Sequence, residues 1–70
     1  MRYTVLYDQA RDGSWGAIVP DLPGCCSAGD SLERARENVK EAISLWLEVE
    51  RESGHSIPRP NTIAETVEIA

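Results

Sequence analysis

The chain has 70 residues, of which 41% are apolar, and its 12 acidic and 7 basic side chains give a net charge of −5. This length leaves room for one small domain, expected over residues 1–70, and a core this small is marginal in a monomer, so we expect copies to associate. The acidic balance argues against direct binding of nucleic acid, which depends on clustered Lys and Arg. No apolar run is long enough to span a bilayer and the N-terminus has no signal-peptide pattern, which predicts a cytoplasmic protein.

The first half of the chain is predicted to form a small sheet. Residues 2–8 and 14–20 both alternate apolar and polar side chains, the period of a strand with one face on a core. The residues between them, 9–13, contain an Asp-Gly pair that favours a hairpin turn. A turn rich in Pro and Gly follows at 21–24, and a short third strand is expected around 25–28.

A long amphipathic helix is predicted over 31–52. We expect Asp30 to cap its N-terminus, with Glu33 completing a capping box, and Gly54 to end the helix. Apolar residues at helical spacing predict one buried stripe, formed by Leu32, Ala35, Val39, Ala42, Ile43 and Trp46. Leu45 lies away from this stripe, which makes it a candidate contact for another chain, although a single exposed leucine is also ordinary.

The last element is predicted to be a strand over residues 62–69, after a Pro-x-Pro connector at 58–60. The order β-β-β-α-β predicts a two-layer α+β fold in which one helix packs on one face of a mostly antiparallel sheet. Leu6 and Ile18 lie on the opposite face, which is then open to solvent or covered by a partner. They join Leu45 as candidate partner contacts.

The residues that could support catalysis do not assemble into a known pattern. His55 is the single histidine and follows the glycine that ends the helix. Cys25 and Cys26 are adjacent, which suits neither an ordinary disulfide nor a zinc site, so we expect reduced packing residues. A metal-dependent nuclease needs carboxylates that converge from strand and helix, whereas Asp8 ends a strand and the helix acids fall mainly on the polar face. We therefore expect no enzyme, no metal and no cofactor.

The residues from Val19 to Ala35 resemble the HicB-like antitoxins of bacterial and archaeal toxin–antitoxin pairs. The shared pattern is Pro-Asp-Leu-Pro-Gly-Cys, then Gly-Asp-Ser and a Glu-x-Ala helix start, with Glu41-Ala42 and Pro58-x-Pro60 further on. Arg34 replaces a second glutamate of the family pattern. The motif residues, which we expect to be mainly structural, are Pro20, Asp21, Leu22, Pro23, Gly24, Cys25, Gly29, Asp30, Ser31, Glu33 and Ala35.

The resemblance covers nearly the whole chain and has several implications. It implies a partial ribonuclease-H-like fold without catalytic carboxylates, whose last strand runs parallel to the first. It also implies that the chain binds and occludes a small basic HicA-like toxin ribonuclease and forms dimers or larger homo-oligomers. Many members continue into a DNA-binding domain, which is not expected here, so operator binding is not carried over. The alternative is a self-assembling domain that binds an unknown ligand or protein and has no toxin.

Overall fold

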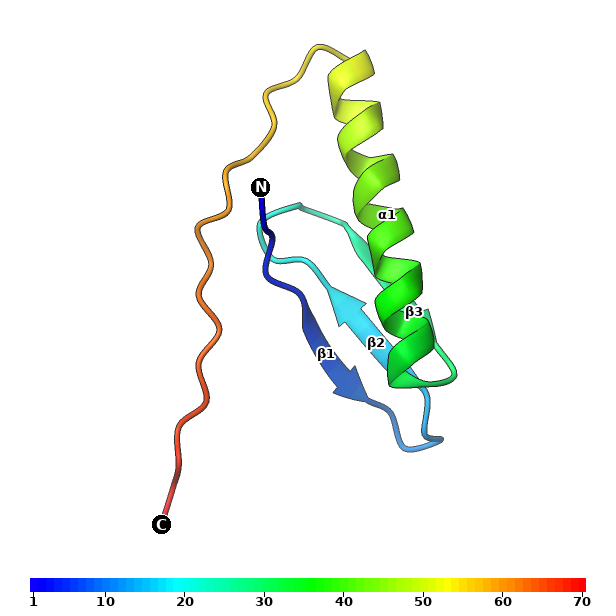
Figure 1. The fold of residues 1–70 in the computed structure, drawn as a ribbon, viewed down its shortest axis with the longest axis vertical. Helices are drawn as coiled ribbons and strands as arrows, with labels where there is room; N and C mark the ends of the chain where they lie inside the picture. The colour runs from blue at the N-terminus through cyan, green and yellow to red at the C-terminus, as the bar shows by residue number, and fades with distance from the viewer.

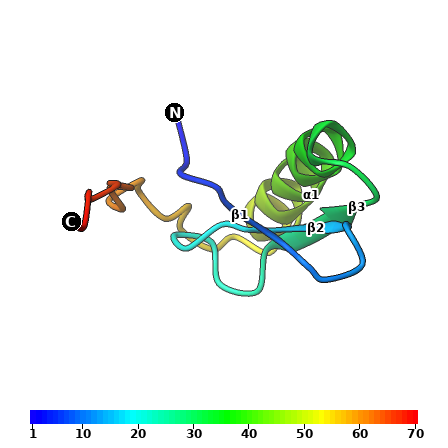
Figure 2. The ribbon, with the colours of Figure 1, turned by 90° about the horizontal axis from the view of Figure 1, so that it is seen from below.

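The computed structural model describes residues 1–70 and contains three strands followed by one helix. The elements are β1 (Leu6–Gln9), β2 (Trp15–Ile18), β3 (Cys26–Gly29) and α1 (Leu32–Glu52). The strands form one antiparallel sheet in the order β1-β2-β3 (Figure 1). Viewed along the sheet, α1 lies on one face and the other face is open (Figure 2). The predicted α+β architecture of a helix on an antiparallel sheet is confirmed.

The hairpin of β1 and β2 has the two faces that the alternating pattern predicts. Tyr7 pairs with Ala17, and Leu6 pairs with Ile18 on the other face. Ala17 is 1% exposed and belongs to the core, whereas Ile18 is 53% exposed. In the connecting turn the carboxylate of Asp12 accepts hydrogen bonds from the Ser14 backbone N–H and hydroxyl, at 2.9 and 2.6 Å. The turn chemistry and the apolar alternation therefore specify the same register.

The turn between β2 and β3 contributes directly to the core. The backbone N–H of Val19 donates to the Cys25 carbonyl at 3.1 Å, which closes the turn, and Leu22 inside it is fully buried. Leu22 packs with Ala17 and Val39 in the central cluster. The motif leucine is therefore an anchor of the hydrophobic core, and the prolines and glycine around it shape the turn that carries it.

The N-terminus of α1 differs from the prediction by one residue. Ser31, not Asp30, is the N-cap: its backbone is extended, with φ −142° and ψ 163°, and its hydroxyl accepts the Arg34 N–H at 3.1 Å. Glu33 then lies one position too early to complete a capping box, because the third helical residue is Arg34. Both Asp and Ser are good caps, and the turn after β3 places the extended backbone at Ser31.

The C-terminus of α1 is where the sequence predicts it. Gly54 has φ +74°, a left-handed conformation that suits glycine, and its N–H donates to the Arg51 carbonyl at 3.1 Å. The His55 N–H donates to the Glu50 carbonyl at 2.9 Å. These two bonds are the Schellman motif, which satisfies carbonyls that the helix leaves without partners.

The core lies between β2, β3 and the inner face of α1, which packs on β3 most extensively and on β2 less so. Ala35 and Val39 are its buried helical residues, with Ala42, Ile43 and Trp46 half-buried beside them, as the predicted stripe requires. The 21-residue helix is about 32 Å long, whereas a four-residue strand spans about 13 Å. The second half of α1 therefore extends beyond the strands and packs on the turn that precedes β3.

The structure forms no strand at 62–69, in contrast to the prediction. Residues 56–70 make no backbone–backbone hydrogen bond, and Ile63 is 90% exposed. A parallel arrangement with β1 is therefore not seen in the single chain. An alternating pattern describes which side chains share a face, but a strand also needs a neighbouring backbone, and none lies beside this segment (Figure 1). No helix is both long and apolar enough to cross a membrane.

Candidate functional site

Leu6 and Ile18 form an apolar patch on the open face of the sheet. They are cross-strand partners in the β1–β2 ladder and are 41% and 53% exposed. Together with Tyr7 and Asp8 they line a shallow hollow of about 320 Å³. Two candidate contacts from distant parts of the sequence thus lie side by side, because the hairpin register aligns them.

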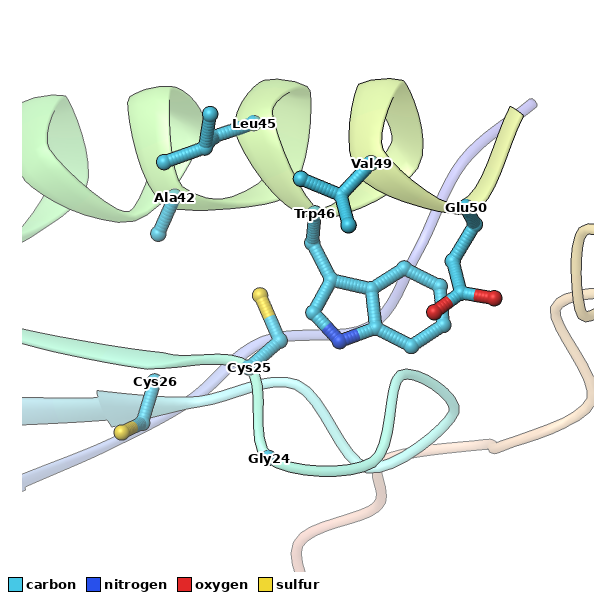
Figure 3. A pocket seen from close by; sticks show the side chains of 8 residues that line it. All are labelled: Gly24, Cys25, Cys26, Ala42, Leu45, Trp46, Val49 and Glu50. Carbon is cyan, nitrogen blue, oxygen red and sulfur yellow. The ribbon is translucent and has the colours of Figure 1, made fainter. Parts of the chain in front are cut away.

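Leu45 lies on a second surface, which adjoins the first through Cys26, the cross-strand partner of Ile18. It is 61% exposed and lines a groove of about 320 Å³ between α1 and the start of β3, together with Gly24, Cys25, Cys26, Ala42, Trp46, Val49 and Glu50. The Trp46 ring lies between the helix and the turn, where its indole N–H donates to the Pro23 carbonyl at 3.0 Å (Figure 3). The groove is mostly apolar and has one acidic end, at Glu50.

The two cysteines differ in their surroundings. The Cys25 sulfur points toward the helix and the residue is 6% exposed, whereas Cys26 points away from it and is exposed (Figure 3). Burial is the main cause that raises the pKa of the Cys25 thiol, and the neighbouring Cys26 raises it further. A thiol with a raised pKa stays protonated at neutral pH and is a poor nucleophile. Cys25 therefore fills space in the core as expected, whereas the same expectation for Cys26 is wrong, because its side chain points away from the helix and is exposed.

The ionisable side chains are spread over the surface. No three His, Cys, Asp or Glu side chains are placed so as to hold one metal ion. The His55 Nδ1 lies 2.7 Å from Glu50 Oε2, beyond the end of the helix, and no hydroxyl or thiol hydrogen-bonds to this pair. The pair lies at the C-terminus of α1, and although Glu50 borders the groove, no nucleophile accompanies the pair there.

Asp21 has a role that the sequence did not reveal. Its Oδ2 accepts the backbone N–H groups of Asn61 and Thr62, both at 3.1 Å, and its Oδ1 accepts the Thr62 hydroxyl at 2.6 Å. These hydrogen bonds lower the pKa of Asp21, and the bond from the Thr62 hydroxyl has the largest effect. Thr4 and Tyr3 add bonds from their hydroxyls to the carbonyls of Thr62 and Pro58, at 2.8 and 2.6 Å. We call the contacts of Thr62 with Asp21 and Thr4 the Thr62 clamp.

The clamp joins the motif turn to the connector after the helix. Thr62 is 41 residues from Asp21 and 58 residues from Thr4, so no local pattern signals these contacts. Within the turn, the Leu22 and Cys25 N–H groups donate to the Val19 and Leu22 carbonyls, so the Asp21 carboxylate is left to accept from donors outside the turn. Of the other motif residues, Gly29 and Ser31 shape the start of α1, and Ala35 is fully buried.

The fold and these surfaces define a small two-layer α+β domain with exposed apolar patches on an acidic molecule. Comparison with known proteins identifies the family of this domain. The family model described as "HicB_like antitoxin of bacterial toxin-antitoxin system" matches residues 3–69. The chain therefore belongs to the HicB-like antitoxin family.

Individual relatives support the same assignment. A "UPF0150 protein" from Thermoplasma acidophilum is 39% identical over 67 residues, which are 96% of this chain and 97% of that protein. An uncharacterized 14.9 kDa protein of Haemophilus phage HP1 is 40% identical over 67 residues, and the chain spans half of its length. "Antitoxin HicB 2" from Photorhabdus laumondii is 31% identical over 65 residues, 93% of this chain and 46% of that protein.

Proposed function

We propose that this chain is a cytoplasmic, non-enzymatic antitoxin that binds a small basic HicA-like toxin ribonuclease and blocks access of RNA to it. The observation that carries the proposal is the match of residues 3–69 to the antitoxin family. The relatives named antitoxin align with 93% of the chain. The chain spans 46% and 42% of the length of those two proteins, and we assign toxin binding to the part that they share with it.

The charge of the molecule supports a basic protein partner. With a net charge of −5, the molecule as a whole attracts a positively charged surface and repels RNA. A basic ribonuclease binds its substrate through cationic groups, so an acidic protein placed over those groups competes with the RNA phosphates. Occlusion of this kind requires no chemistry from the antitoxin.

The apolar contacts in such a complex are proposed to come from the two surfaces described above. Leu6 and Ile18 form one patch, and Leu45 borders the groove beside α1. Interfaces place apolar anchors in the centre and charged groups around them. Both surfaces have this composition, so each is a candidate for the centre of the contact.

A binding and protection assay with a HicA-like toxin tests the proposal. We expect the wild-type chain to bind the toxin and stop RNA cleavage at a fixed molar ratio. Leu45→Glu is compared with Ser44→Glu, which makes the same charge change at the adjacent exposed position; Ile18→Glu tests the other patch. At least one of the two apolar substitutions should weaken binding tenfold or more, while Ser44→Glu changes it little. Cleavage that continues at excess wild-type chain would rule out the antitoxin function.

A second function, a self-assembling domain without a toxin, is favoured by one observation. Ile63, Val67 and Ile69 are 90%, 72% and 82% exposed, although they share one face of an extended segment. Apolar groups gathered in this way mark surfaces that another chain covers. Sedimentation of the chain alone tests this: a folded monomer at micromolar concentration would contradict self-assembly, whereas a defined oligomer without any toxin would support it.

A further inference from the structure

β3 is an edge strand with unused backbone groups. It pairs with β2 on one side and has no strand on the other. The Val19 N–H donates to the Cys25 carbonyl at 3.1 Å, which makes these two residues a hydrogen-bonded pair. Such pairs alternate with non-hydrogen-bonded pairs along an antiparallel ladder, so the backbone groups of Cys26 and Ala28 point away from β2. The Asn38 side chain donates to the Ala28 carbonyl at 2.7 Å. The Cys26 N–H and C=O and the Ala28 N–H are left free at the edge.

The groove beside α1 runs along this free edge. Leu45 and Val49 on the helix and Cys26 on the strand line the same groove (Figure 3). The two helical side chains are 61% and 49% exposed, so they form an apolar wall that nothing in the single chain covers. An extended backbone beside Cys26 would place alternate side chains on the helix side, against this wall. The edge therefore offers both backbone hydrogen bonds and apolar contacts to an added strand.

The side of α1 that borders the groove is acidic. Glu41 and Glu48 lie four residues before and three residues after Leu45, spacings that share one side of a helix. Both carboxylates are exposed and take part in no ion pair. The nearest basic residues along the helix, Lys40 and Arg51, lie five residues before and six residues after Leu45, which turns them to the other side. The groove thus has an acidic rim, which attracts a segment that carries Lys or Arg.

The exposed C-terminal segment of this chain does not match the rim. Residues 63–69 contain Glu65 and Glu68 and no basic residue, so a copy of this segment on β3 would face like charges from Glu41 and Glu48. Pairing of two β3 edges would likewise bring two acidic rims together, and like charges on neighbouring strands are destabilising. The chemistry of the groove therefore favours another protein over a second copy of this chain.

We propose that the groove between β3 and α1 binds an extended, basic segment of another protein, which adds to the free edge of β3 as a further strand. The residue opposite Cys26 exchanges backbone hydrogen bonds with it. The neighbouring residues of the segment point toward the helix, where an apolar side chain contacts Leu45 and Val49. The next side chain on that side is a Lys or Arg, whose stem lies along the apolar wall while its charge reaches Glu41 or Glu48. Docking of this kind goes beyond the antitoxin function and needs no toxin.

The synthetic peptide acetyl-Lys-Thr-Leu-Thr-Leu-Thr-Lys-amide tests the proposal, because its Lys and Leu side chains alternate with Thr on opposite faces of a strand. We expect saturable binding in an NMR titration, with slower hydrogen exchange of the Cys26 and Ala28 amides. The same peptide with Glu in place of both Lys residues should bind at least tenfold more weakly. Absence of saturable binding up to about 1 mM of the basic peptide would overturn the proposal.

Methylation of the peptide backbone shows whether the peptide docks as a strand. When the Leu side chains face the helix, the Thr N–H groups face β3 and the Leu N–H groups face solvent. N-methylation of the central Thr should therefore abolish binding, whereas N-methylation of a neighbouring Leu should leave the dissociation constant within about threefold. Equal effects of the two methyl groups would overturn docking on the strand edge.

Two charge reversals separate the acidic rim from the net charge of the molecule. Glu48→Lys should weaken binding of the basic peptide about fivefold, because it replaces an attraction at the rim by a repulsion. Glu33→Lys makes the same charge change in the first turn of α1, away from the groove, and should change the dissociation constant less than about twofold. Circular dichroism establishes that both variants keep the helix. Equal weakening by the two variants would overturn the role of the rim.

Hydrogen exchange of the chain without peptide tests the other occupant of the edge. We expect the Cys26 and Ala28 amides to exchange at the same rate at all chain concentrations. If they become protected as the chain concentration rises, a second copy covers the edge and the proposal is overturned. Toxin binding is measured separately, and a chain that binds no toxin can still bind the basic peptide.

Discussion

At the scale of single residues, Gly29 shows how closely the sheet and the helix approach. A methyl group added to its Cα would lie 2.5 Å from the Ala35 nitrogen and 2.8 Å from the Arg34 carbonyl carbon, both backbone atoms that cannot move aside separately. We expect Gly29→Ala to lower the free energy of unfolding by about 1–3 kcal/mol, the usual result of overpacking. Gly16→Ala is the control: it lies in β2, and its added methyl would meet the Asp8 side chain at 3.4 Å. Urea unfolding followed by circular dichroism compares the two, and equal losses would contradict the steric explanation.

At the scale of elements, the start of α1 depends on one hydroxyl. Ser31 accepts the Arg34 N–H, whereas the Asp30 side chain makes no such bond. We therefore expect Ser31→Ala to cost about 1 kcal/mol in unfolding free energy. Asp30→Ala is expected to cost less, because it removes only a charge near the N-terminus of the helix. A larger loss for Asp30→Ala, measured by urea or thermal unfolding, would restore Asp30 as the cap.

The Thr62 clamp makes the position of the C-terminal connector depend on pH. Hydrogen bonds from Thr62 and Asn61 hold the pKa of Asp21 below its ordinary value of 3.8. Because the folded pKa lies below the unfolded one, the stabilisation is complete above the unfolded pKa and is lost as the pH falls through the lowered folded pKa. We expect the amide signals of Asn61 and Thr62 to move toward random-coil positions in that acidic range, before α1 unfolds.

Asp21→Asn is the control variant for this titration. It should show displaced Asn61 and Thr62 amide signals already at neutral pH and no further step in acid. The pKa of Asp12 is lowered as well, but its bonds are to Ser14 in the β1–β2 turn. Its titration should therefore move the Ser14 amide and not that of Thr62. If the Thr62 signal titrates unchanged in Asp21→Asn, the clamp is not its cause.

At the scale of the whole molecule, charge should govern the rate of association with a basic partner. A net charge of −5 attracts a basic partner from a distance. Salt screens this attraction, with a screening length of about 10 Å at 0.1 M. We expect the association rate with a HicA-like toxin to fall roughly tenfold between about 50 and 500 mM salt, while the dissociation rate changes much less. Stopped-flow mixing measures both rates. An association rate independent of salt would show that the acidic surface takes no part in recognition.

Much of the architecture could be predicted from local patterns because the interactions concerned are themselves local. Alternation in the first two strands predicted that Ala17 and Val19 face the core and that Leu6 and Ile18 face away, as observed. Helical spacing around Val39 identified the inner face of α1 in the same way. These patterns succeed because burying the apolar face of each element stabilises a single register.

The candidate site could be predicted only in part. Leu6, Ile18 and Leu45 were each recognisable as apolar residues outside the core, but their grouping into a patch and a groove depends on hairpin register and on how far α1 extends past the sheet. The Asp21–Thr62 contact was not predictable, because its partners lie 41 residues apart and the local sequence of neither residue indicates the other. Asp30 and Ser31 were equally good caps by type, and the path of the chain after β3 decided between them.

The sequence by itself determined the order of the first three strands and the helix, the inner faces of β1, β2 and α1, the two ends of α1 to within one residue and the family; its fifth element, a strand at 62–69, is not formed. Those features depend on side-chain periodicity and on turn and cap residues, which act over a few positions. Only the tertiary structure decided that residues 63–69 remain without a partner in the single chain, that Thr62 is held by Asp21, and how the exposed apolar residues are grouped. A strand forms only when another backbone lies beside it, and a surface patch forms only when residues distant in the sequence are brought together. Both features therefore depend on the assembled molecule.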